Sequence, residues 1–178
     1  MSTAAPAATS YSVIRLTVDV PASVEEFRQQ YEQAVPFWPR EQVDALVARG
    51  APWSEMLKLI ENAAPFGFVI YWRNDVRPVM RLAGDTGQGV FYLMGNHTIA
   101  ERMFRHEPSV MLHAPLRTVL YADPDGDTKL AVDQPSLLFN SYDKPEIADV
   151  GYELDGLLAQ LIELLGAQAP AQLRVRVP

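Results

Sequence analysis

The residues best suited to acid–base chemistry in this chain are its three histidines, His97, His106 and His113. His113 follows Met111 closely and precedes Pro115 and an apolar run, so we expect its ring to be partly buried. Burial lowers the pKa of an imidazole and favours the neutral form, which can accept a proton near neutral pH. His113 is therefore the candidate catalytic residue, although a hydrogen-bonded structural histidine is the commoner origin of such a pattern.

The other two histidines have settings that ordinary helix chemistry explains. His97 and Glu101 are four residues apart, the spacing at which two side chains meet on one face of a helix, so a solvated pair is expected there. His106 precedes Glu107 and Pro108, which is typical of the last turn of a helix. No second ligand pair accompanies His97 and the chain has no cysteine, so we predict neither a metal site nor a cofactor.

A second chemical feature is a group of aromatic and methionine side chains that could line an apolar pocket. Aromatic residues are frequent on two predicted strands, 66–73 and 89–94. Trp53 at the start of a predicted helix would add an indole, and Asn96 after the second strand would add an amide. Small-molecule pockets are mostly apolar with a few polar groups, although a plain hydrophobic core would produce the same pattern. The predicted binding residues are Trp53, Tyr71, Trp72, Phe91, Asn96 and Met111.

The periodicity of the sequence predicts an α+β scaffold for these residues. The predicted strands span 11–20, 66–73, 78–83, 89–94, 115–122, 128–134 and 172–177. The predicted helices span 24–34, 40–49, 53–63, 96–106 and 149–165. Because the strands come in consecutive groups, with helices before and after them, we expect a mostly antiparallel sheet with helices packed mainly on one face.

Composition narrows the class of protein. The chain has 178 residues, 48% hydrophobic and 21% charged, which favours one globular domain over 10–178 after a disordered tail at 1–9. A net charge of −7 disfavours nucleic acid and anionic membrane surfaces as partners. No apolar run approaches the roughly 20 residues of a membrane helix, and the start of the chain lacks a secretory signal. We therefore expect a cytoplasmic protein.

An ordered set of short motifs in the second half carries a family resemblance. "LMGN" at 93–96 is followed by a helix, then "EPSVML" at 107–112, "PLR" at 115–117, and a "DPDGD" turn at 123–127 between two strands. In these features the chain resembles the domain-of-unknown-function-302 family. The resemblance implies a compact α+β fold that forms a homodimer, and it implies no reaction.

Against this family pattern, two features of the chain stand out. Residues 36–65 would be an inserted helical pair, and His113 stands where the family tends to carry an acidic or apolar residue.

Three hypotheses for function follow. The first is a cytoplasmic protein that binds an apolar or aromatic small molecule between its sheet and the inserted helices. The second is an enzyme that uses the same pocket to shape a reactive substrate, with His113 moving a proton. The third is a protein-interaction module that docks a partner through its acidic surface and the aromatic pair Phe37 and Trp38.

Overall fold

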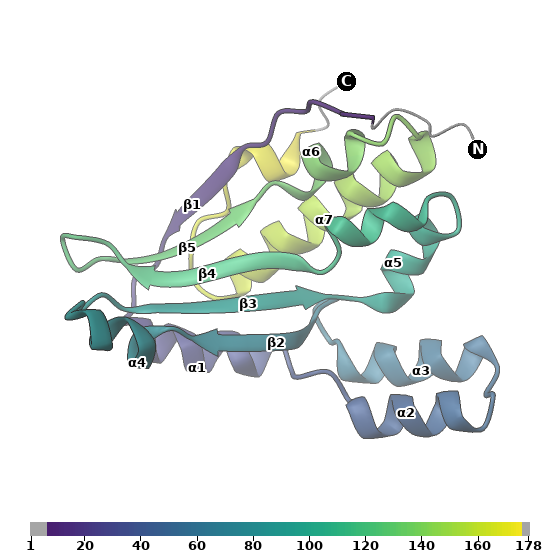
Figure 1. Cartoon of the computed structure of the whole chain (residues 1–178), viewed down its shortest axis with the longest axis horizontal. Coiled ribbons are helices and arrows are strands. Elements are labelled where there is room, and N and C mark those ends of the chain that lie inside the picture. The colour runs from purple at the N-terminus through teal and green to yellow at the C-terminus, as the bar shows by residue number, and fades with distance from the viewer. Residues whose placement is uncertain (1–6, 176–178) are drawn as a thin grey trace, which may run out of the picture.

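The framework of the protein is a five-stranded antiparallel sheet in the order β1-β5-β4-β3-β2 (Figure 1). The computed structural model describes residues 7–175. The strands are β1 (Arg15–Asp19), β2 (Val69–Asp75), β3 (Gly89–Gly95), β4 (Leu116–Ala122) and β5 (Thr128–Asp133). The last four form a meander, and β1 returns to pair with β5 at the far edge.

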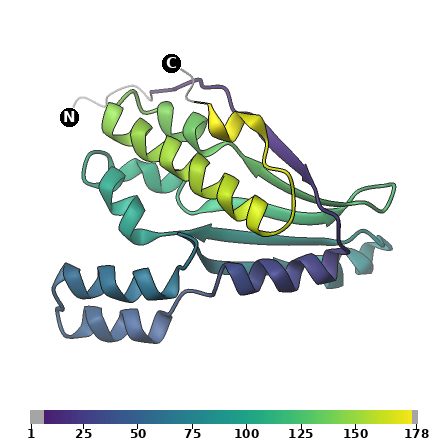
Figure 2. The ribbon, with the colours of Figure 1, turned by 180° about the vertical axis from the view of Figure 1, so that it is seen from behind.

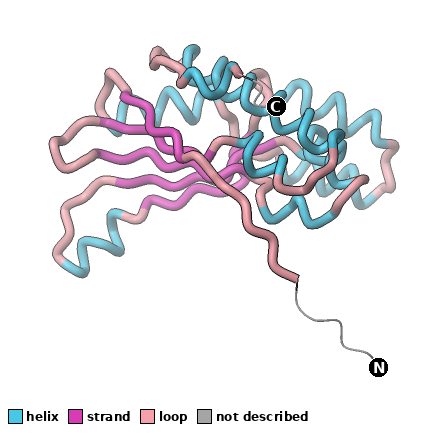
Figure 3. The backbone as a smooth tube through the Cα atoms, turned by 90° about the horizontal axis from the view of Figure 1, so that it is seen from above, coloured by secondary structure: helices cyan, strands magenta, loops and turns pink. Residues whose placement is uncertain are grey.

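Helices cover one face of this sheet, as expected for the α+β class. The helices are α1 (Val24–Ala34), α2 (Arg40–Ala48), α3 (Trp53–Ala63), α4 (Arg77–Met80), α5 (His97–Phe104), α6 (Pro135–Asn140) and α7 (Pro145–Leu164). Three 3-10 turns add η1 (Arg81–Ala83), η2 (Pro108–Leu112) and η3 (Ala171–Arg174). Seen from behind, α1 and α7 lie in front of the sheet, while α2 and α3 form a pair at the end of β2 (Figure 2). The view from above shows helices along one side of the strands and further helices beyond the strand ends (Figure 3).

Tyr31 of α1 fixes this helix on the sheet. Its side chain is fully buried, and its hydroxyl lies 2.9 Å from Met94 Sδ and 3.0 Å from Thr118 Oγ1. A capping box between Ser23 and Glu26 begins the same helix. One polar contact inside an apolar interface fixes the rotation of the helix, because an unpaired hydroxyl there would cost more than the bond contributes.

Apart from the start of β2, where Val69 packs against Ile60 of α3, no helix among the described residues covers the opposite face of the sheet. Trp72 is 48% exposed there, and its ring centroid lies 5.4 Å from that of Phe91. The Arg117 guanidinium lies over the Phe91 ring, 5.7 Å from its centroid. Aromatic groups on this face therefore contact one another and solvent, not the helical layer.

The strand predicted at 78–83 is wrong, because this segment forms α4 and η1. Asp75 accepts the main-chain N–H of Arg77 at 3.1 Å and pairs with its guanidinium, which starts a helical turn. Pro78 falls in the first turn, where its missing N–H has no cost. Every residue of 78–83 is exposed, so the alternating apolar side chains of this segment do not pack against the core.

Both ends of the chain also differ from the predictions. The edge strand predicted at 172–177 is wrong over its described part, which forms η3, and residues 176–178 lie outside the described range. Most of the tail predicted at 1–9 also lies outside that range. Among residues 7–175, no helix combines the length and apolar character needed to cross a membrane.

Asp155 of α7 is a buried carboxylate that joins the helical layer to the sheet. The residue is 2% exposed, and it accepts the main-chain N–H of Ser136 and the side-chain amide of Gln134, both at 2.9 Å. Burial raises the pKa of Asp155, and the hydrogen bonds from Ser136 and Gln134 oppose that rise. Gln134 follows β5, Ser136 lies in the first turn of α6, and Asp155 belongs to α7. The Asp155 side chain therefore connects these three elements.

Replacing Asp155 with alanine should lower the free energy of unfolding by about 2 kcal/mol, because a buried main-chain N–H loses its acceptor. Glu153→Ala on the same helix is the control. Its ion pair with Arg102 is exposed, and such a pair contributes less than about 1 kcal/mol. Urea denaturation monitored by circular dichroism measures both variants, and equal losses would contradict the structural role of Asp155.

Candidate functional site

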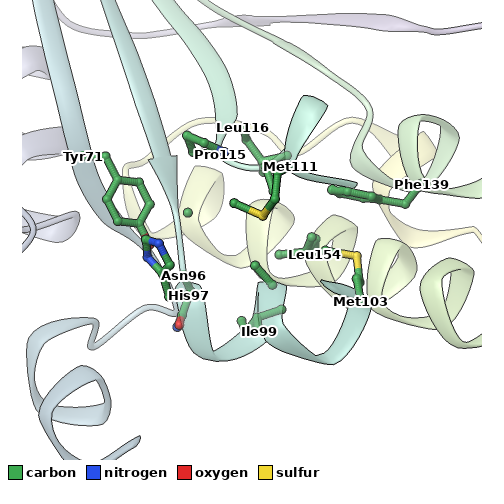
Figure 4. A pocket seen from close by; sticks show the side chains of 13 residues that line it. Tyr71, Asn96, His97, Ile99, Met103, Met111, Pro115, Leu116, Phe139 and Leu154 are labelled. Atoms are coloured by element: carbon green, nitrogen blue, oxygen red, sulfur yellow. The ribbon is translucent and has the colours of Figure 1, made fainter. Parts of the chain in front are cut away.

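An apolar cavity of about 140 Å³ lies between the end of the sheet and helices α5, α6 and α7 (Figure 4). Strand residues form one side and the helices the other. Its apolar walls include Ile99, Met103, Met111, Leu116, Phe139 and Leu154. The cavity is enclosed on several sides by side chains that offer no hydrogen bonds, so water gains little by occupying it.

A tyrosine–histidine pair forms the polar part of the cavity wall. Tyr71 Oη lies 2.6 Å from His97 Nδ1, and the two rings meet edge to face with centroids 4.9 Å apart. Burial raises the pKa of the Tyr71 hydroxyl and lowers the pKa of the His97 imidazole. Both groups are therefore neutral at pH 7.

The Tyr71 hydroxyl and His97 Nδ1 share one hydrogen bond, in which the tautomer of the imidazole decides the donor. A main-chain contact with His97 partly opposes the rise in the pKa of Tyr71. The site thus places a tyrosine hydroxyl and a neutral imidazole beside an apolar volume.

A β-bulge aims Tyr71 at this histidine. Ile70 pairs with Met94 and Trp72 pairs with Leu93, so Tyr71 is the extra residue on β2. Bulges commonly re-aim one side chain out of the regular alternation. Gly95 leaves room for the ring, since a Cβ there would lie 3.3 Å from Tyr71 Cε2.

Trp38 packs against both members of the pair. Its ring centroid lies 4.7 Å from that of His97 and 5.0 Å from that of Tyr71. The segment before α2 holds it there, because Trp38 N–H donates to Ile70 C=O at 2.9 Å and Ile70 N–H donates to Pro36 C=O at 2.8 Å. The chain between α1 and α2 therefore acts as a short parallel extension of the sheet beside β2.

A second apolar hollow adjoins the cavity. It is a groove of about 270 Å³ between α3 and α5, lined by Trp53, Met56 and Phe104. His97 and Met111 line both the groove and the cavity. The groove is open to solvent, and it extends the apolar volume toward the helical pair.

The structure brings together some of the predicted binding residues. Tyr71, Asn96 and Met111 line the cavity, and Trp53 lines the adjoining groove. The Asn96 side chain is already engaged, because its oxygen caps α5 at Thr98 and its amide donates to Gly67 C=O at 3.1 Å. Its role in the site is to begin the helix that carries the histidine.

Trp72 and Phe91 were expected in the same pocket, and the structure places them on the open face of the sheet. The bulge at Tyr71 is the reason. Regular alternation from Ile70 would direct Trp72 to the helical side, but the extra residue shifts the alternation by one.

His113 also lies apart from the cavity. The chain turns at Ala114 and Pro115, which line the cavity, while the His113 ring packs edge-on against Tyr11 and Phe139. Its Nε2 lies 3.3 Å from Tyr11 Oη, and burial lowers its pKa. The expectation that His113 serves the same pocket as Tyr71 is not met.

Two residues of the site, Trp38 and His97, were missed by reasoning from sequence. The solvated pair expected between His97 and Glu101 does not form, because Glu101 binds Arg105 at 2.5 Å instead. The sequence signal that could have identified His97 was its position directly after a strand and a helix-capping asparagine. Across residues 7–175, no cluster of three or more histidine, aspartate or glutamate side chains is arranged to hold a metal ion.

Comparison with known proteins places the fold and most of the site in one family. The family model described as "Domain of unknown function DUF302" matches residues 51–165. This chain belongs to that family. The matched range includes α3, so the second helix of the predicted insertion lies inside the family region, while α2 and Trp38 precede it.

A solved structure supports the fold assignment. The crystal structure of an uncharacterized conserved DUF302 protein from Bacillus stearothermophilus superimposes with a TM-score of 0.61. It shares 18% sequence identity, over 85% of this chain and 97% of that chain. Identity at this level shows a common fold. A search of curated proteins found no match.

We expect His97 to titrate below its ordinary pKa of 6.5, because burial disfavours its charged form. The unfolded chain takes up this proton at about pH 6.5 and the folded protein takes it up at lower pH, so stability should fall as the pH drops below about 6.5. Proton NMR of the imidazole ring measures the pKa, and thermal melts measure the stability. A His97 pKa at or above 6.5 would contradict the buried neutral pair.

Proposed function

We propose that this protein binds a small apolar or aromatic molecule in the cavity beside Tyr71 and His97. The carrying observation is the cavity itself, an apolar volume of about 140 Å³ with one polar pair on its wall. Pockets for small molecules combine apolar walls with a few placed polar groups, and this cavity has that composition.

The volume limits the size of the buried group. An apolar cavity of about 150 Å³ in another protein accommodates one benzene ring and stays dry without it. A volume of about 140 Å³ therefore suits one six-membered ring or an aliphatic group of similar size. Met103 and Met111 on the wall can adjust to different shapes, because the methionine side chain is unbranched and flexible.

We assign the Tyr71–His97 pair a role in orienting the ligand, and no role in catalysing a reaction. The Tyr71 hydroxyl and His97 Nδ1 are already bonded to each other, so neither atom is free to act as a base or nucleophile. The second ring nitrogen of His97, Nε2, can form a hydrogen bond with a polar atom of a ligand. An enzyme that depends on His113 is not favoured, because the His113 ring does not line the cavity and packs against Tyr11 and Phe139 instead.

Homodimer formation and partner docking stay predictions. Trp38 of the proposed docking pair is packed on Tyr71 and His97, whereas Phe37 is 50% exposed with Arg73 over its ring. A partner surface would therefore involve Phe37 or the open sheet face, and the ligand cavity would remain on the helical side.

Saturating p-xylene should raise the melting temperature of the protein, and Leu154→Phe should abolish the shift by filling the cavity. A ligand at a hundred times its Kd stabilises the folded state by about 2.7 kcal/mol. Leu164→Phe is the matched control, since it makes the same change on the same helix at a position that is 51% exposed. Differential scanning calorimetry measures all three proteins.

Two outcomes would overturn the proposal. One is a wild-type protein whose melting temperature does not respond to p-xylene, benzene or indole. The other is a shift of equal size in Leu154→Phe and Leu164→Phe, which would place the ligand elsewhere. Circular dichroism of the variants without ligand checks that each one folds.

A further inference from the structure

We propose that the ligand has two parts, a ring that fills the cavity and an apolar chain that lies in the groove between α3 and α5. This inference rests on the proposed function, and it names the class of ligand as a ring with an alkyl substituent. The helix α3, which begins at Trp53, would then select ligands by the length of that chain.

The cavity and the groove adjoin at residues that line both of them. These residues are His97, Ala100 and Met111. Ala100 contributes a single methyl group to the boundary. Met111 is 40% exposed on a 3-10 turn, and its flexible thioether can move aside at little cost. The boundary is thus built from one small side chain and one mobile side chain.

The groove offers apolar volume that one ring in the cavity does not reach. The groove measures about 270 Å³ and the cavity about 140 Å³, so a single ring leaves most of the apolar volume unused. Trp53 and Phe104 on the groove walls are 44% and 46% exposed. Large apolar side chains that are half exposed beside a cavity mouth are typical of binding sites, because burying them against a ligand stabilises the complex.

The charges at the groove favour a neutral chain over a charged group. Glu101 is the acidic residue on the groove wall, and its carboxylate is bound to the Arg105 guanidinium at 2.5 Å. The pair leaves no single charge to recruit an ionic group. An alkyl chain would pack on Trp53, Met56 and Phe104 without disturbing that pair.

The first experiment measures affinity across toluene, propylbenzene and hexylbenzene by isothermal titration calorimetry. All three present the same ring to the cavity, and the chain length differs. Complete burial of one methylene group raises affinity roughly fourfold, so we expect about twofold per methylene in a groove that is open on one side. Affinity should therefore increase from toluene to hexylbenzene by at least tenfold.

The second experiment repeats the series with Trp53→Ala and with Trp72→Ala. The two tryptophans are similarly exposed, at 44% and 48%, but Trp72 lies on the open sheet face. Trp53→Ala should leave toluene affinity unchanged and reduce the gain with chain length to less than half. Trp72→Ala should leave both unchanged. Met56→Ser provides a second groove variant and should act like Trp53→Ala.

The outcomes separate this inference from the function on which it rests. If toluene binds and the longer compounds bind no more tightly, the two-part ligand is excluded while the cavity site stands. Equal gains with chain length in Trp53→Ala and Trp72→Ala would place the chain outside the groove and overturn the inference. If none of the three compounds binds, the proposed function itself fails.

Discussion

The candidate site depends on one extra residue in β2. The bulge at Tyr71 turns that side chain out of the strand alternation and brings its hydroxyl to 2.6 Å from His97. Without the bulge, Trp72 would point to the helical layer. The same shift places Trp72 and Phe91 together on the open face. One local irregularity therefore decides which aromatic groups meet the cavity and which meet solvent.

The polar pair matters because its surroundings are apolar. Trp38 covers the His97 ring, and Asn96 fixes the first turn of α5 that carries it. In such a setting an unpaired hydroxyl or imidazole would be costly, so the pairing of Tyr71 with His97 specifies the shape of the wall. The rest of the cavity is formed by apolar side chains from elements that the chain must bring together anyway to build its core.

Local patterns predicted most of the scaffold. The alternation at 11–20 predicted β1, the helical periodicity at 24–34 predicted α1, and the "DPDGD" turn predicted the β4–β5 hairpin, because each signal is contained in neighbouring residues. The strand predicted at 78–83 failed since the same alternation occurs in an exposed turn, where only Asp75 and Pro78 reveal the helical start. No sequence pattern predicted the bulge, because the residues on either side of Tyr71 are apolar or aromatic and their types do not show which one lacks a cross-strand partner. The structure places Tyr71 on the cavity wall and Trp72, expected in the same pocket, beside Phe91 on the open face.

The most direct test of the account is a crystal structure of the protein soaked with iodobenzene, with the iodine located by its anomalous signal. The account predicts one ring inside the cavity, in contact with Met103, Phe139 and Leu154 and within reach of His97. Iodine found only on the open sheet face near Trp72, or an empty cavity at a concentration that saturates binding in solution, would contradict it.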